Sequence, residues 1–281
     1  MTETPPQPGP GLYPGVSRDW YDQVVGVNYS YLKHFRFSPL HARQHRIAPP
    51  DQTKAMSLGS AEHAAVLYPG QFDEQFAEAP KFDKRTKVGK EGWAKFEADS
   101  GDRMILTDSE MQRVKAMQKS VWLNTTANGL LTGKGANEMA IVWDDAICST
   151  RCKGLIDRMS TDREGYPCII DVKTAKDVSD NGFSRAMNTF AYHIQAAMYL
   201  RGAADIEPIQ RRYYFIAVEN HAPFDCRVLR LNDDAIEQGT REVERYLRLN
   251  DISQKSGVWP GTGNGLVTLP PWGFDRSVDE F

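Results

Sequence analysis

One hairpin, predicted over residues 152–174, constrains the fold of this chain more than any other stretch. Its sequence is CKGLIDRMSTDREGYPCIIDVKT, and an alternation with a period of two indicates arms at 152–160 and 168–174. Charged residues stand inside these apolar arms. Because side chains alternate across a strand, such a hairpin must place some of its charges on a buried face.

Two carboxylates of the hairpin are expected to face each other. Asp157 lies on the first arm and Asp171 on the second, where Lys173 follows on the same face, about 7 Å further along the strand. Carboxylates about 4 Å apart repel by about 4 kcal/mol at an effective dielectric constant near 20. Either one carboxyl is protonated or a cation lies between them. A hard divalent ion such as Mg²⁺ satisfies two carboxylates, a backbone carbonyl and water molecules.

The spacing of these residues resembles that of the PD-(D/E)xK nuclease superfamily. A G-x-x-D motif at 154–157 is followed by Asp171-Val172-Lys173 at the end of an apolar strand, as in RecB-type nucleases. The resemblance implies that Asp157, Asp171 and the Val172 carbonyl bind the metal ion and that Lys173 orients the attacking water. The alternative is a surface hairpin with an ordinary Asp–Lys pair.

A predicted helix of small residues, at about 56–68, carries a histidine that extends this resemblance. The pattern L-G-x-A-x-H at 58–63, followed by L-x-P-x-x-F at 67–72, is similar to the corresponding helix of exonuclease VIII, the RecE-type phage and prophage nucleases. There the histidine belongs to the metal site, so the resemblance implies that His63 is a metal ligand. A lone histidine on a helix is otherwise more often a satisfied core residue.

Three further polar residues are candidates for the site. Gln195 and Tyr199 lie four residues apart, on one face of a helix predicted over 183–203, and match the Q-x-x-x-Y helix of RecB-like nucleases. The resemblance implies that Gln195 lies beside the catalytic lysine. Glu138 occupies a place where the resemblance expects an acidic residue. Ordinary polar groups on a half-buried helix and a strand-edge glutamate are the alternatives.

Two basic stretches are candidates for DNA contact. Residues 81–95 hold six lysines and arginines against Asp83 and Glu91, with aromatic residues interleaved. Next to a phosphodiester-cleaving centre this stretch predicts phosphate contacts by Lys84, Arg85, Lys87 and Lys90. Residues 33–46 form a second basic cluster that contains three histidines. For both stretches a merely solvated surface is the alternative.

Bulk composition excludes several classes of protein. The 281 residues carry a net charge of −3, so any attraction for nucleic acid must be local. No apolar run is long enough to span a membrane, and the N-terminus does not resemble a signal peptide. The four cysteines are expected to be reduced, without the C-terminal trio that an iron–sulfur cluster of related nucleases requires. A cytoplasmic location, in a bacterium or a phage-infected cell, is expected.

The predicted architecture is α/β: a bent, mixed sheet of the PD-(D/E)xK nuclease type, flanked by helices and preceded by an N-terminal helical region. The strands are expected near 138–146, 152–160, 168–174, 211–219 and 226–231, and a closing helix at 233–250. Residues 1–18 are expected to form a flexible or extended Pro/Gly-rich arm, and 19–281 a single nuclease domain. The resemblance covers about 29–272 and includes W-P-G at 259–261 and L-P-x-W at 269–272.

The function implied by the resemblance is hydrolysis of DNA phosphodiester bonds with Mg²⁺, or Mn²⁺, as the metal. Exonuclease VIII relatives degrade one strand from duplex DNA ends in the 5′ to 3′ direction and leave single strands for recombination. They assemble as rings and work with a single-strand annealing protein, and both features are implied here. The alternatives are an endonuclease or single-strand-specific nuclease of the same superfamily, and a non-catalytic DNA-binding or assembly protein on this scaffold.

Overall fold

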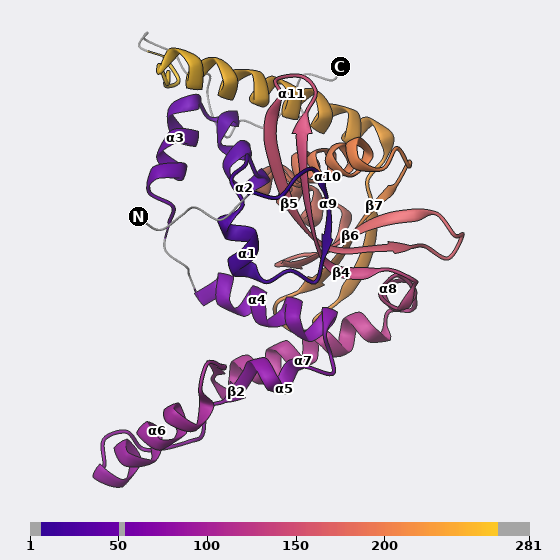
Figure 1. Ribbon diagram of the computed structural model, residues 1–281. Coiled ribbons are helices and arrows are strands. Elements are labelled where there is room, and N and C mark those ends of the chain that lie inside the picture. Colours follow the sequence, from indigo (N-terminus) through magenta and orange to yellow (C-terminus); the bar gives the residue numbers. More distant parts are fainter. Residues whose placement is uncertain (1–6, 51–53, 264–281) are drawn as a thin grey trace, which may run out of the picture.

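A six-stranded mixed sheet forms the centre of the computed structural model, which describes residues 7–50 and 54–263 (Figure 1). β6 and β7 pair in parallel, and the other neighbours pair antiparallel. The predicted α/β fold, a mixed sheet flanked by helices, is confirmed. In sheet order the strands are β1 (Gly11–Pro14), β4 (Ala136–Asp145), β5 (Thr150–Thr161), β6 (Pro167–Ala175), β7 (Arg212–Glu219) and β8 (Cys226–Arg230).

Helices cover both faces of this sheet, and strand β6 shows why. Ile169 packs into one apolar cluster, whereas Ile170 and Val172 pack into the other, because successive side chains point to opposite faces. The first face carries α1 (Arg18–Gln23), α2 (Tyr29–Leu32), η1 (Lys33–Arg36), α3 (Pro39–Ile47), α9 (Asp180–Phe190), α10 (Tyr192–Ile206) and α11 (Asp233–Ser256). The second carries α4 (Lys54–Leu67), α7 (Asp108–Leu123) and α8 (Thr125–Thr132).

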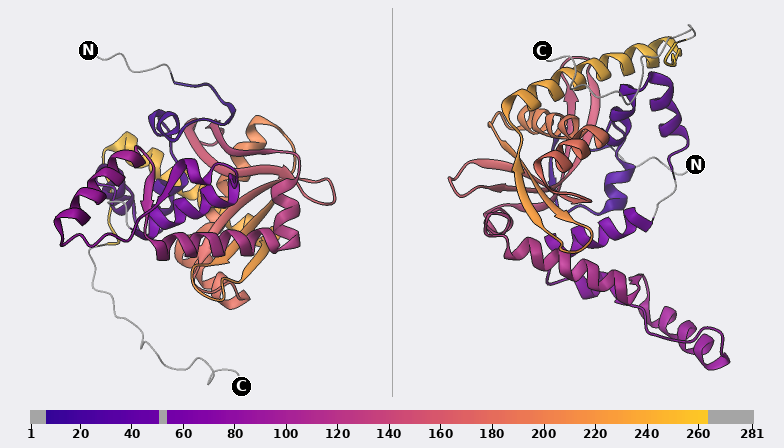
Figure 2. Two further views of the ribbon diagram at one scale, coloured as in Figure 1. Left: turned by 90° about the horizontal axis from the view of Figure 1, so that it is seen from below. Right: turned by 180° about the vertical axis from the view of Figure 1, so that it is seen from behind.

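A long projection, here called the arm, leaves the second face (Figures 1 and 2). It comprises β2 (Phe76–Glu78), α6 (Lys87–Ser100) and β3 (Met104–Leu106), and it follows the short helix α5 (Phe72–Gln75). β2 and β3 pair in parallel at its root. The short strands were not predicted, because three residues are too few to show a period. Helix α6 was not predicted either, and it occupies most of the stretch that looked like a basic loop.

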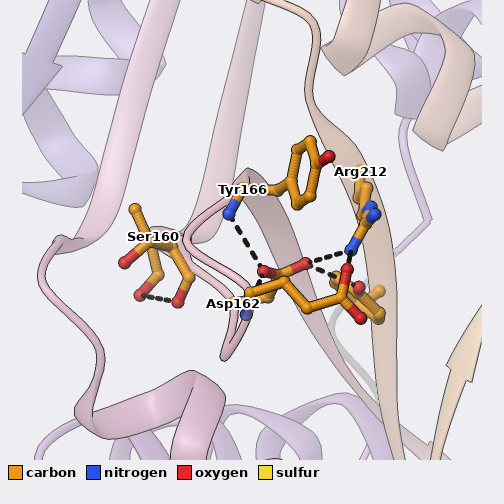
Figure 3. A network of polar contacts seen from close by, with 7 residues as sticks. Ser160, Asp162, Tyr166 and Arg212 are labelled. Carbon is orange, nitrogen blue, oxygen red and sulfur yellow. Dashed lines mark hydrogen bonds and ion pairs between the residues drawn. The ribbon is translucent and has the colours of Figure 1, made fainter.

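The turn of the central hairpin is fixed by one carboxylate (Figure 3). Asp162 accepts hydrogen bonds from the backbone N–H groups of Glu164 and Tyr166, each at 3.0 Å, and forms an ion pair of 2.8 Å with Arg212. Arg212 lies on β7, so this network ties the turn to the neighbouring strand. The side chain of Asp162 is almost fully buried, and the hairpin register is therefore fixed at its tip as well as by its apolar faces.

Several sequence-based boundaries need correction. Gly11–Pro14 lies within the predicted flexible arm, yet it pairs with β4 as an edge strand. The helix predicted over 183–203 is two helices, because Ala191 has a left-handed backbone (φ 59°) and separates α9 from α10. The L-P-x-W motif at 269–272 lies outside the described residues. In the part of the chain that the structure describes, no helix is long and apolar enough to cross a membrane.

Candidate active site

Four side chains from three elements meet at the splayed end of the β5–β6 hairpin, and we call them the cluster. His63 comes from α4, Asp157 from β5, and Asp171 and Lys173 from β6. The backbone pairing of β5 with β6 ends at Arg158 and Ile170. Beyond that point backbone pairing gives way to contacts between the cluster side chains and the strands.

Asp157 occupies the position opposite Asp171 if the register is continued by one residue. Its carboxylate Oδ2 accepts a hydrogen bond of 2.7 Å from the backbone N–H of Val172, so the side chain replaces a rung of the ladder. On the other side of β5, pairing with β4 skips the position of Glu138, whose φ of 48° is left-handed. Irregular backbone thus flanks Asp157, a feature found near functional sites.

His63 joins the helix α4 to both strands of the hairpin. Its Nε2 lies 2.8 Å from the carbonyl oxygen of Val172, and its Nδ1 lies 3.5 Å from Oδ2 of Asp157. Burial lowers the pKa of His63, but the charges of Asp157 and Glu62 outweigh this effect, and the pKa is raised. Nε2 donates a hydrogen bond to the Val172 carbonyl, and Nδ1 lies within ion-pair distance of Asp157 when the ring is protonated, so His63 contacts both strands of the hairpin.

Asp171 and Lys173 form a buried ion pair within β6. Gln195 of α10 donates a hydrogen bond of 3.0 Å to Oδ1 of Asp171, which is 1% exposed. Burial, reinforced by the charge of Asp157, raises the pKa of Asp171 to about 6. Burial opposes ionisation of Lys173 too, yet the charges of Asp171 and Asp157 raise the pKa of this ammonium group. Lys173 is therefore a protonated donor at neutral pH.

Tyr199 explains the glycine of the G-x-x-D motif. A Cβ atom added at Gly154 would lie 2.7 Å from the ring of Tyr199, so only glycine lets α10 approach β5 this closely. The Tyr199 hydroxyl also lies 3.5 Å from Nε2 of Gln195. Gly154, Gln195 and Tyr199, which are far apart in the sequence, thus form one packing unit behind the cluster.

A cleft of about 1130 Å³ opens in front of the cluster. His63, Asp157 and Lys173 line it, together with residues of α1, α2, α4 and the root of the arm. Glu138 also lines the cleft, where its carboxylate accepts a hydrogen bond of 3.1 Å from the hydroxyl of Tyr68. The cleft therefore connects the hairpin to the arm, and its size suits a polymeric substrate rather than a buried small molecule.

The predicted DNA contacts lie on the arm rather than at the cluster. Lys84 sits 3.0 Å above the ring centre of Trp93, Arg85 pairs with Asp83, and Lys87 lies 3.9 Å from Glu91. Lys90 is exposed on α6. The structure brings His63, Asp157, Asp171, Val172, Lys173, Gln195 and Tyr199 together, with Glu138 on the cleft wall, and it places Lys84, Arg85, Lys87 and Lys90 apart from them.

Glu62 is a buried residue beside the cluster that the sequence patterns did not single out. It is fully buried beside His63, and neither carboxyl oxygen has a hydrogen-bond partner. Burial raises its pKa to about 7. The signal was present, because Glu62 lies four residues from both Leu58 and Val66, on the apolar face of the helix.

The donors present fit a hard divalent cation, although they are turned toward one another. Among the described residues no three His, Cys, Asp or Glu side chains form a group that could hold a metal ion. The Val172 carbonyl, expected to share an ion with His63, instead accepts from the imidazole. Burial and the nearby charge of Asp157 raise the pKa of Asp171, and a cation bound beside this carboxylate would oppose both effects. Carboxylate and carbonyl oxygens are the ligands that Mg²⁺ and Mn²⁺ favour.

Comparison with solved structures agrees with this fold. The crystal structure of a "putative exonuclease" from Eubacterium rectale is similar over 87% of this chain and 90% of that chain, with a TM-score of 0.57 and 13% sequence identity. The structure of SSO0001 aligns over 71% of this chain and 88% of that chain, at 13% identity, but its TM-score of 0.30 carries no argument. No curated protein sequence matches.

A family model also matches most of the chain. The model of the "PDDEXK-like domain of unknown function (DUF3799)" matches residues 28–265 of the 281. This range contains the cluster, the arm and most of the residues that line the cleft. The chain therefore belongs to the family of PDDEXK-like domains.

Proposed function

We propose that this chain is a divalent-metal-dependent nuclease that hydrolyses phosphodiester bonds of DNA. The observation that carries the proposal is the meeting of His63, Asp157, Asp171 and Lys173 at one end of a cleft. A binding protein has no need for two facing carboxylates beside a buried ammonium group, because such an arrangement costs stability. PDDEXK nucleases typically use divalent metal ions.

Asp157, Asp171, His63 and the Val172 carbonyl would hold the ion, Mg²⁺ or Mn²⁺. When bound, such an ion neutralises phosphate charge and lowers the pKa of water toward neutrality. In the structure Lys173 pairs with Asp171, and His63 contacts the Val172 carbonyl, so both contacts involve atoms that the ion would share.

The remaining residues have distinct proposed roles. Lys173 keeps its proton at neutral pH, so it acts as a donor that orients water and offsets charge on the phosphate, not as a base. Gln195 holds the Asp171 carboxylate in one orientation, and Tyr199 packs behind it. Glu138 would make the electrostatic potential at the cleft wall more negative.

Exonuclease action is the finer part of the proposal. The fold neighbour described as a putative exonuclease and the resemblance to exonuclease VIII both support it. The proposed substrate is the end of linear double-stranded DNA, degraded in the 5′ to 3′ direction by a ring of copies that hands single strands to an annealing protein.

Digestion of end-labelled linear duplex DNA tests the proposal. With Mg²⁺ or Mn²⁺ we expect progressive loss of one strand, none in EDTA, and early release of a 5′ label. Lys173→Ala should reduce the single-turnover rate by at least about 1000-fold, with thermal melting as the check of folding. An undiminished rate would contradict the role of Lys173. Cutting of closed circular DNA would instead indicate an endonuclease.

A further inference from the structure

A second basic surface lies on the other side of the cleft from the arm. Residues 33–46 read KHFRFSPLHARQHR, with four lysines or arginines and no acidic residue, in a chain whose net charge is −3. They form η1 and α3. We define the η1–α3 patch as Lys33, Arg36, Arg43 and Arg46.

The charges of the patch are not neutralised by neighbouring carboxylates. Within the described part of the chain none of the four forms an ion pair with Asp or Glu; their observed contacts are with aromatic rings and backbone carbonyls. Lys33 lies 5.1 Å from the ring centre of Tyr29, and Arg46 lies 5.4 Å from that of Tyr31. Arg36 donates hydrogen bonds of 3.0 and 2.7 Å to carbonyls at the end of α9.

The histidines of the segment add little to this charge at neutral pH. The rings of His34 and His45 stack with centres 4.1 Å apart. Burial, with help from His45 and Lys33, lowers the pKa of His34 to about 4. Burial lowers the pKa of His45 as well. The stacked pair therefore packs η1 against α3 as neutral rings, and the lysine and arginines supply the positive field.

The patch is continuous with the cleft. Asn28 and Ser30, at the start of α2, line the cleft, and Lys33 follows directly on η1. Burial lowers the pKa of Lys33, and the charges of Arg36 and Lys173 lower it further, so Lys33 lies within electrostatic range of the cluster. In Figure 1, α1, α2 and α4 lie between α3 and the arm.

An exposed aromatic ring completes the surface. Phe37 is 49% exposed, and the guanidinium carbon of Arg36 lies 4.5 Å from its ring centre. An apolar ring held at the edge of a cationic surface is typical of sites where nucleic-acid bases stack.

We propose that the η1–α3 patch binds the phosphate backbone of the same DNA whose cleavable phosphate enters the cleft. The inference rests on the proposed function and adds a second anchoring surface, opposite the arm. The partner is identified by charge: four cations that form no ion pair with the described acidic residues, and that lead away from a phosphodiester site, fit a polyanion. The strand would run from Lys33 at the cleft toward Arg43 on α3.

The test is the salt dependence of DNA binding, measured by fluorescence anisotropy on labelled duplex DNA in EDTA. For Lys33→Gln/Arg36→Gln we expect the slope of log K against log salt to fall by about 2, and the affinity at about 100 mM salt to fall roughly tenfold. Arg36 also supports α9, so Lys33→Gln/Arg43→Gln provides a second variant without side-chain hydrogen bonds to lose. Lys115→Gln/Lys119→Gln, on the exposed face of α7, removes equal charge and should leave the slope unchanged.

The outcomes separate this inference from the proposed function. If both patch variants keep the wild-type slope, the patch does not bind DNA, whatever the nuclease assay shows. If the control pair lowers the slope as much as the patch variants do, the effect is general charge and the inference fails. If the wild-type protein binds DNA through the patch but never cleaves it with Mg²⁺ or Mn²⁺, the patch is supported and the nuclease proposal falls.

Discussion

The cluster and the arm carry charge in opposite ways. In the cluster the charged groups are buried and meet one another across β5, β6 and α4, and Lys173 is only 16% exposed. In the arm the lysines and arginines are exposed, and Arg85 and Lys87 lie close to Asp83 and Glu91 on the same segment. Buried interactions act in a low dielectric and are strong, whereas exposed pairs contribute about 0–1 kcal/mol.

The number of basic residues in a segment therefore does not give the positive charge that the segment offers to a ligand. The arm has the larger number of basic residues in the sequence, but the structure gives several of them acidic neighbours. The η1–α3 patch has fewer, and none has an acidic partner among the described residues. Exposed pairs are weak enough for phosphate to compete with them, so the DNA-binding roles of Lys84, Arg85, Lys87 and Lys90 stay predictions.

The largest effect is expected for the variant His63→Ala. If the buried cluster governs metal binding, loss of this bridging imidazole should raise the Mg²⁺ concentration for half-maximal cleavage by at least about tenfold. The measurement is a titration of Mg²⁺ in the cleavage assay. His221→Ala, which changes an exposed histidine on the loop between β7 and β8, is the matched control. Equal half-saturation for His63→Ala and wild type would make His63 structural.

The second prediction concerns the pH dependence of stability that the buried carboxyl of Glu62 produces. Its pKa is raised from 4.5 to about 7, so the folded state holds a proton that the unfolded state releases. Ionisation of Glu62 therefore lowers the free energy of unfolding. This loss is absent below the pKa of the unfolded state, grows as the pH rises through the pKa of the folded state, and reaches about 3 kcal/mol. Glu62→Gln removes the charge. We expect the free energy of unfolding of the variant, relative to that of the wild type, to increase by about 2–3 kcal/mol between about pH 5 and about pH 8.

Denaturant unfolding at both pH values measures this gain. Glu97→Gln removes an exposed carboxylate from the arm and should show no such gain. A wild-type pH dependence retained by Glu62→Gln would mean that the carboxyl finds a partner on ionisation.

The smallest effect is expected on the arm. Lys84→Gln/Arg85→Gln/Lys87→Gln should lower the salt slope of DNA binding by about 1–2 rather than the full 3, because Arg85 and Lys87 already have acidic neighbours. Affinity at about 100 mM salt should fall only several-fold. The same anisotropy titration measures it, with Lys115→Gln/Lys119→Gln as control. An unchanged slope would remove the arm from the DNA-binding surface.

Much of the fold could be read from the sequence because local patterns encode it. Alternation predicted β4 to β8 to within a few residues, and helical spacing predicted α4 and most of α11. Short or irregular elements could not be read in this way. β1 depends on pairing with β4, β2 and β3 have three residues each, and the break at Ala191 depends on a single backbone angle.

The sequence by itself determined which residues are candidates for the site, because D-x-K on an apolar strand and G-x-x-D on its partner are tied to the alternation of a hairpin. Only the tertiary structure decided how they are paired. It turned His63 toward Val172, closed Lys173 onto Asp171, buried Glu62 without a hydrogen-bond partner, and left the η1–α3 patch without ion pairs to the acidic residues that the structure describes. The physical reason is that burial and ion pairing depend on segments far apart in the chain, which no local pattern records.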